Sequence, residues 1–198
     1  MTTPKTLLEM AGASLAPPKL ADSVLLVIDA QGEYREGRLP LDGIDASLDV
    51  LAALIGRARA AGAVVVHVAH KGRAGGLFDR DAAGGAILAQ AAPMPGETVV
   101  EKPLPNAFAG TNLAETLAAI GRKELVVAGY QTHMCVSSTA RAALDLGYRV
   151  TIPHDACATR ALPDATGGAP ISGAEIHRHA LAELADRFAI VVPAAALA

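Results

Sequence analysis

The chain has 198 residues, a length typical of one domain and short for two. Hydrophobic residues make up 52% of it and charged residues only 19%, which excludes a chain that is disordered throughout. The formal net charge of −3, without any run of Lys or Arg, and the 3% content of aromatic residues argue against binding to nucleic acids or to anionic membranes.

The sequence carries no sign of export or of membrane insertion. Its N-terminal segment lacks the apolar core of a signal peptide, and no window holds the roughly 18 apolar residues that a transmembrane helix needs. Two cysteines, Cys135 and Cys157, are too few for a disulfide framework, so we expect free thiols. These features predict a cytoplasmic protein.

Apolar runs rich in β-branched residues predict six strands. They cover residues 23–29, 63–69, 97–100, 124–129, 148–152 and 188–192, of which 97–100 is the weakest. Apolar residues at a spacing of three and four predict helices between them, over residues 45–60, 111–120, 136–146 and 172–187. Strands that alternate with helices indicate a parallel sheet with right-handed crossovers. We predict a single-domain, three-layer α/β/α fold with a six-stranded parallel, Rossmann-like sheet, formed by residues 22–193 after an N-terminal extension over residues 1–21.

Two long segments, residues 71–95 and 159–171, fit no regular element. The first is rich in glycine and has a partial helical pattern over residues 83–90. Long irregular segments in a compact domain are often lids or binding loops, and this interpretation and that of surface filler both stay open. After the second segment, Ser172 and Glu175 predict a capping box at the start of the last helix.

Three reactive side chains follow predicted strands, where open parallel sheets bind their ligands. Asp29 ends the first strand, Lys102 follows the third, and Cys135 lies where the segment after the fourth strand enters a helix. A thiol at a helix start faces free backbone N–H groups, which lower its pKa and offer oxyanion donors. Each residue also has an ordinary interpretation: an inert cysteine, a capping carboxylate, a solvated lysine. Together, at adjacent strand ends, they predict a cysteine hydrolase.

Three motifs surround these residues in order along the chain. They are residues 27–31 (VIDAQ), Lys102 followed by residues 106–111 (NAFAGT), and residues 129–136 (GYQTHMCV) followed by Thr139 and Ala140. In this order they resemble the isochorismatase-like cysteine hydrolase superfamily, which includes nicotinamidases and N-carbamoylsarcosine amidase. The resemblance spans about residues 22–193, and it implies an isochorismatase-like hydrolase fold and a catalytic triad of Asp29, Lys102 and Cys135.

The resemblance also implies a mechanism. Asp29 would act as the base and Lys102 as a supporting cation, while the Cys135 sulfur attacks a small-molecule amide or ureide and forms a thioester that water hydrolyses. A cis peptide bond is implied between Tyr130 and Gln131, and the backbone N–H groups of Gln131 and Cys135 would form the oxyanion hole. No cofactor is implied.

Further residues are candidates for the substrate pocket. Gln31, Tyr34 and Phe108 are predicted to contact substrate, with ordinary packing as the alternative for each. His70 lies at a strand end and is a candidate to line the site. His133 lies two residues before the cysteine and is a weaker candidate, for a Cys–His dyad.

The segment after the second strand departs from the nicotinamidase pattern. Nicotinamidases usually carry Asp-x-His and a further His there, which bind a divalent metal, whereas this chain reads HVAHKGR over residues 67–73. We therefore predict no metal site, and a dedicated nicotinamidase is disfavoured. His67 lies mid-strand and is predicted to belong to the core, as is Cys157.

Several different functions stay open. True isochorismatases cleave a vinyl ether and need no cysteine nucleophile, so Cys135 favours hydrolysis of an amide or ureide. A redox-sensing thiol and a non-catalytic homologue also stay open. A nucleotide-binding protein is disfavoured because residues 29–32 read DAQG, without the Gly-x-Gly-x-x-Gly pattern. The resemblance favours a homo-oligomer, a dimer or tetramer, and leaves the substrate open.

Overall fold

A parallel sheet forms the centre of the computed structural model, which describes residues 3–198. Six strands lie in the order β3-β2-β1-β4-β5-β7, and a short strand, β6, pairs with β4 beyond the end of β5. The strands are β1 Ser23–Ile28, β2 Val64–His70, β3 Thr98–Lys102, β4 Glu124–Tyr130, β5 Arg149–Pro153, β6 Cys157–Ala158 and β7 Ile190–Val192. The predicted parallel α/β fold is confirmed. β6 is an addition, because a strand of two residues leaves no pattern in a sequence.

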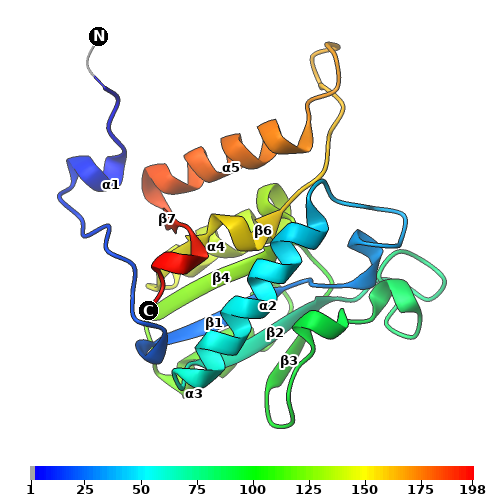
Figure 1. Ribbon diagram of the computed structural model, residues 1–198, viewed down its shortest axis with the longest axis horizontal. Helices are drawn as coiled ribbons and strands as arrows, with labels where there is room; N and C mark the ends of the chain where they lie inside the picture. Colours follow the sequence, from blue (N-terminus) through cyan, green and yellow to red (C-terminus); the bar gives the residue numbers. More distant parts are fainter. Residues whose placement is uncertain (1–2) are drawn as a thin grey trace.

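Helices cover both faces of the sheet (Figure 1). They are α1 Leu7–Met10, α2 Ile44–Ala60, α3 Leu113–Ile120, α4 Ser137–Asp145 and α5 Gly173–Arg187. α2 packs on the face to which Leu25 and Val27 of β1 point, whereas α3, α4 and α5 pack on the face of Val24, Leu26 and Ile28. Since both faces are covered, every residue of β1 is buried, which explains its continuous apolar run.

The observed helices differ from the predicted ones at the start of α4 and near the N-terminus. A π-helical turn, Thr132–Val136, precedes α4, so the chain begins to coil four residues earlier than predicted. The capping box of α5 is confirmed: Ser172 accepts from the Glu175 N–H, and Glu175 accepts from the Ser172 N–H. α1 was not predicted, and the Leu7 N–H ties it to the Asp186 carboxylate on α5 at 2.9 Å. No helix within residues 3–198 is long and apolar enough to cross a membrane.

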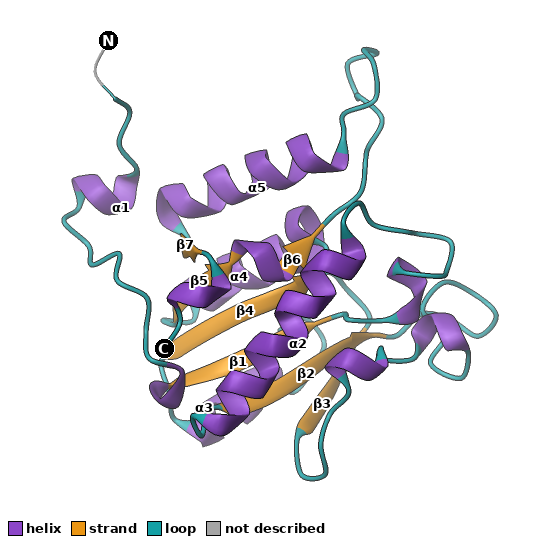
Figure 2. Ribbon diagram, viewed as in Figure 1, coloured by secondary structure: helices purple, strands orange, loops and turns teal. Residues whose placement is uncertain are grey.

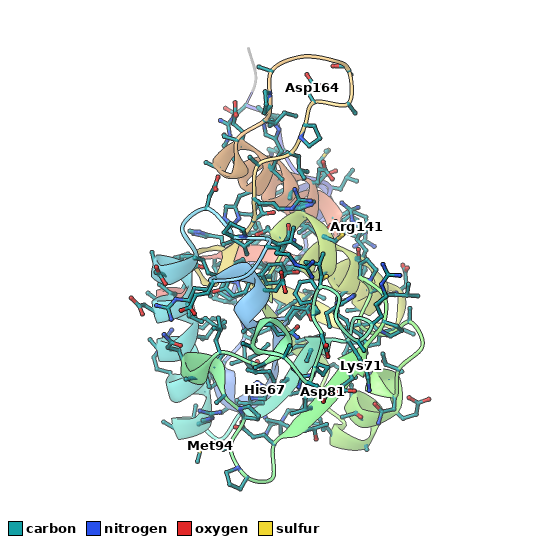
Figure 3. The ribbon with its side chains drawn as sticks, turned by 90° about the vertical axis from the view of Figure 1, so that its right-hand side faces the viewer. His67, Lys71, Asp81, Met94, Arg141 and Asp164 are labelled. Atoms are coloured by element: carbon teal, nitrogen blue, oxygen red, sulfur yellow. The ribbon has the colours of Figure 1, made fainter. Side chains whose placement is uncertain are left out.

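The carboxyl ends of the strands meet at one edge of the sheet, from which the long loops extend (Figure 2). Figure 3 looks onto this edge, where Lys71 and Asp81 mark the loop over residues 71–95. That loop contains two short 3₁₀ turns, Ala83–Gly85 and Ala89–Ala91, in place of the partial helix predicted over residues 83–90. The segment 159–171 projects away from the sheet, with Asp164 near its tip (Figure 3).

Candidate active site

Asp29, Lys102 and Cys135 come together at the carboxyl edge of the sheet. Asp29 directly follows β1, and its backbone N–H donates to the Val68 carbonyl of β2 at 2.9 Å. Lys102 is the last residue of β3, and Cys135 lies in the π-helical turn after β4. Three different strands, β1, β3 and β4, therefore bring the three side chains to the same edge of the sheet.

The strands that carry them are not all neighbours, which corrects the prediction of three adjacent strand ends. β2 lies between β1 and β3, and His70 at the end of β2 is paired in register with Lys102. Lys102 therefore reaches across the end of β2, and a long side chain is required at this position. Its Nζ lies 2.7 Å from Asp29 Oδ2 and 3.2 Å from Cys135 Sγ.

The three groups are removed from water. Asp29 and Lys102 have no exposed surface, and Cys135 is 5% exposed. A charged side chain in such a place is costly unless it is paired, and the Asp29–Lys102 ion pair meets this requirement. Burial raises the pKa of Asp29, although the nearby Lys102 charge opposes the shift.

The pKa of the Cys135 thiol differs from the sequence-based expectation. Burial, followed by the negative charge of Asp29, raises this pKa to about 12, even though Lys102 acts in the opposite direction. We expected a lowered pKa from the helix start, but desolvation outweighs that effect at this buried position. Without a bound substrate the site therefore holds a protonated thiol, which needs a base to become a nucleophile.

The backbone after β4 is shaped by Gly129. Its φ is +113°, and a Cβ at this position would lie 2.1 Å from the Ile28 carbonyl oxygen of β1. The following Tyr130–Gln131 peptide bond is cis. The Gln131 carbonyl then accepts from the backbone N–H groups of Met134 and Val136, which closes the π-helical turn around Cys135.

The predicted substrate contacts lie in three different environments. Tyr34 is buried against the site: its ring packs edge-on against Phe78 and Tyr130, and burial together with the charges of Asp29 and Cys135 raises its pKa. Phe108 is half-buried and stacks on Tyr148, just before the amino end of β5. This contact directs the Phe108 ring away from the carboxyl edge, so ordinary packing accounts for it.

Gln31 is fully buried and is bonded to backbone groups. Its amide nitrogen donates to the carbonyls of His70, at 3.0 Å, and Gly85, at 2.8 Å, and its amide oxygen accepts from the His70 N–H at 2.8 Å. Gln31 therefore fastens the end of β2 to the loop over residues 71–95. Both of its amide N–H donors are used in these contacts, which leaves none for a substrate.

The histidines separate into core and site positions. His67 is buried and bonded to Glu97 at 3.0 Å, so its predicted core position is confirmed. His70 Nδ1 lies 3.3 Å from Lys102 Nζ, which places His70 at the site. His133 Nδ1 is bonded to the Thr159 hydroxyl, and no hydrogen bond between His133 and the Cys135 sulfur is found among the described residues.

Arg160, which follows β6, was not singled out from the sequence. Its charge opposes the rise in the pKa of Tyr34 and, after burial, contributes to the lowered pKa of His133, so the guanidinium lies on the site side of the molecule. Its Nε is buried and has no hydrogen-bond partner within residues 3–198. Arg160 can be located only from the fold: β6 pairs with β4, and this pairing brings the residues after Ala158 beside those after Tyr130.

The comparisons with known proteins identify the family of this chain. A sequence model of the isochorismatase domain matches residues 23–196. The chain belongs to the isochorismatase family. The crystal structure of an isochorismatase from Pseudomonas putida KT2440 superimposes with a TM-score of 0.94 at 42% identity, over 99% of this chain and 100% of that one.

Curated relatives carry different activities in their names. The secreted isochorismatase effector Isc1 of Verticillium dahliae is 42% identical over 89% of this chain and 92% of its own. Streptothricin hydrolase of Streptomyces noursei is 38% identical over 95% of this chain and 76% of its own. Ureidoacrylate amidohydrolase RutB of Stutzerimonas stutzeri is 30% identical over 70% of each chain. The family is therefore one of hydrolases that differ in substrate.

Proposed function

We propose that this protein is a cysteine hydrolase that cleaves the C–N bond of a small amide or ureide, with Cys135 as the nucleophile. The observation that carries the proposal is the buried chain of contacts from Asp29 through Lys102 to the Cys135 sulfur, at 2.7 and 3.2 Å. A thiol with a raised pKa beside a carboxylate suits a nucleophile that is activated only during the reaction. The name of the relative RutB, an amidohydrolase, supports the reaction class.

The first half-reaction acylates the thiol. The Asp29 carboxylate takes the thiol proton while the Cys135 sulfur bonds to the carbonyl carbon, and the carbonyl π electrons move to its oxygen. The backbone N–H groups of Gln131 and Cys135 would stabilise this oxyanion, and loss of one such donor costs on the order of 10²–10³ in rate. As the C–N bond breaks, Asp29 gives its proton to the leaving nitrogen, and a thioester remains.

The second half-reaction releases the acid. Asp29 takes a proton from water, whose oxygen attacks the thioester carbon, and the C–S bond breaks. The thiolate then recovers its proton from Asp29, so that amide and water have become acid and amine. Lys102 keeps its charge throughout and offsets the negative charge that moves between Asp29 and the sulfur.

The substrate is proposed to be a small molecule that carries an anionic group. Arg160 supports this, because its buried Nε offers a hydrogen bond that no described residue accepts. A carboxylate is the group that a guanidinium binds best. Amides and ureides with a carboxylate, such as carbamoylated amino acids and maleamate, are therefore the first compounds to test, beside nicotinamide and neutral aliphatic amides.

Release of ammonia by wild type, Cys135→Ala and Cys157→Ala tests the proposal. Cys157 is the matched control, because it is also a buried, free thiol whose pKa burial raises to about 12. We expect release that needs Cys135 and not Cys157, together with an acyl adduct on Cys135 in the mass spectrum of rapidly quenched enzyme. Full activity of Cys135→Ala on an amide that the wild type hydrolyses would overturn the assignment.

Cleavage of a vinyl ether is a second candidate, favoured by the 42% identity to a relative named as an isochorismatase. Because this reaction needs no cysteine nucleophile, it predicts turnover of isochorismate that survives Cys135→Ala. A redox-sensing role is less well supported, since burial raises the pKa of both thiols and so disfavours the reactive thiolate.

We also propose a cytoplasmic, homo-oligomeric enzyme that acts without nucleic-acid or membrane partners. The two free, buried cysteines support a reducing compartment. One relative is named as secreted, so fractionation of the native cells is the deciding measurement for location. Light scattering of the purified protein tests the oligomeric state.

A further inference from the structure

The Lys102 ammonium has three N–H donors and lies fully out of water. Three partners surround it: Asp29 Oδ2, in an ion pair at 2.7 Å, and two hydrogen-bond acceptors, Cys135 Sγ at 3.2 Å and His70 Nδ1 at 3.3 Å. The number of partners matches the number of donors. A buried donor that loses its partner is costly, so each acceptor fixes one direction of the ammonium.

The chemistry of this contact fixes the state of the His70 ring. An ammonium can only donate, so Nδ1 must accept, and the ring proton must be on Nε2. Burial and the Lys102 charge lower the pKa of His70 to about 4, which keeps the ring neutral and able to accept near pH 7. Nδ1 faces the buried lysine, while the ring as a whole is only half-buried.

The surroundings of His70 hold its ring in place. Gln31 brackets the His70 backbone by accepting from its N–H and donating to its carbonyl. The Phe78 ring packs edge-on against the imidazole, with 5.1 Å between the ring centroids. Phe78 itself has a φ of +56°, a conformation that a bulky side chain rarely adopts, so the surrounding loop holds it there.

We propose that His70 is a positioning residue, which accepts the third N–H of the Lys102 ammonium and so aims this cation at the Cys135 sulfur. Gln31 acts one step further out, by holding His70. The inference rests on the proposed function in that it takes Cys135 as the nucleophile. It goes further by adding a residue that touches neither the sulfur nor the carboxylate.

Two polar variants separate this role from simple packing. In His70→Asn the side-chain oxygen can take the place of Nδ1, whereas in His70→Gln the amide takes the place of the outer nitrogen, Nε2. His179→Gln, an exposed position on α5, is the matched control. Circular dichroism establishes that each variant is folded before it is compared.

The readout is the rate at which iodoacetamide alkylates Cys135, followed over pH by peptide mass mapping. A misaimed ammonium stabilises the thiolate less, so we expect His70→Gln to slow alkylation on the order of tenfold near neutral pH, equivalent to about one pKa unit. His70→Asn should stay within about threefold of wild type, and His179→Gln should match it. Equal rates for His70→Asn and His70→Gln would overturn the proposal.

Alkylation needs no substrate, so its outcome is independent of the proposed function. If amide hydrolysis is absent but alkylation separates the two variants as expected, His70 still positions Lys102 and only the reaction class is wrong. Where hydrolysis is found, we expect His70→Gln to lower kcat with little change in KM, because Lys102 acts on the reacting charges. A rise in KM with an unchanged kcat would contradict a positioning role and indicate that His70 contacts the substrate.

Discussion

At the scale of single residues, Lys102 determines most of the properties of the site. It neutralises Asp29, contacts the sulfur and contributes to the neutral state of His70. Lys102 has no exposed surface, so the loss of one of these partners would leave a buried polar group unpaired, which is costly. The site is therefore stabilised as a unit.

Removal of this cation is expected to reduce stability as well as activity. Lys102→Met leaves Asp29 buried without a partner, which typically costs about 3–5 kcal/mol of unfolding free energy. Urea denaturation measures this loss. Lys71→Met is the control, since Lys71 and its partner Glu101 are exposed and the change there should be small. Equal stability of the two variants would show that the buried pair contributes no more than a surface pair.

His70 gives the stability a dependence on pH. Its pKa is about 4 in the folded protein and returns toward 6.5 on unfolding, so the unfolded chain takes up the proton first. The folded state therefore loses stability as the pH falls from about 6.5 toward 4. His70→Asn lacks this proton, so the wild type should lose more stability than this variant across the window, as measured by urea denaturation at each pH. A constant difference between them would contradict the assignment.

The sequence predicted only part of the site at this scale. Asp29, Lys102 and Cys135 could be found because each stands directly at or after a strand end, and a short motif surrounds each. His70 was a candidate because it ends a predicted strand, but its contact with Lys102 could not be predicted, since that contact depends on β2 lying beside β3. Arg160 could not be found, because its position depends on the short strand β6. The raised pKa of the thiol was also missed, since burial depends on the assembled fold.

At the scale of elements, the turn after β4 is built on the close approach of Gly129 to β1. A Cβ would collide there with the Ile28 carbonyl, and the neighbouring Asp29 has a φ of +48°. The carboxyl ends of β4 and β1 therefore approach each other closely beside the site. Glycine is required at this position for space as well as for its backbone angle.

A pair of glycine variants tests this requirement. Gly121, after α3, also has a positive φ, +76°, but a Cβ there would meet nothing within 4 Å. Gly121→Ala should cost about 1–2 kcal/mol, the strain of a left-handed residue. Gly129→Ala should cost clearly more, or yield no folded protein, in thermal or chemical denaturation. If both variants are equally stable, the contact with Ile28 does not constrain the turn.

Elements with a strong periodic pattern were predicted best. The buried strands and α2 lie within a few residues of their predicted ends, because apolar spacing reports directly on burial. The π-helical turn, α1 and β6 were missed. These three elements depend on local backbone geometry or on a distant partner, such as the contact of Leu7 with Asp186. Such dependences leave no periodic apolar pattern in the sequence.

At the scale of the whole molecule, the site gathers groups suited to proton transfer and not to metal binding. Within residues 3–198, no three His, Cys, Asp or Glu side chains are grouped so that they could hold a metal ion. We expect dialysis against EDTA to leave the hydrolytic rate unchanged, with added Zn²⁺ or Mn²⁺ giving no increase. A loss of activity that a divalent ion restores would contradict this prediction.

The position of β1 in the middle of the sheet has a consequence for how the protein fluctuates. In the order of the sheet, β4, β5 and β7 lie on one side of β1 and β2 and β3 on the other, and Asp29 follows this inner strand. In native-state hydrogen exchange, the amides of such an inner strand exchange through global unfolding of the protein, whereas those of edge strands exchange through local opening. Asp29 should therefore keep its geometry during partial openings of the outer strands, and the β1 amides should be among the last to take up deuterium.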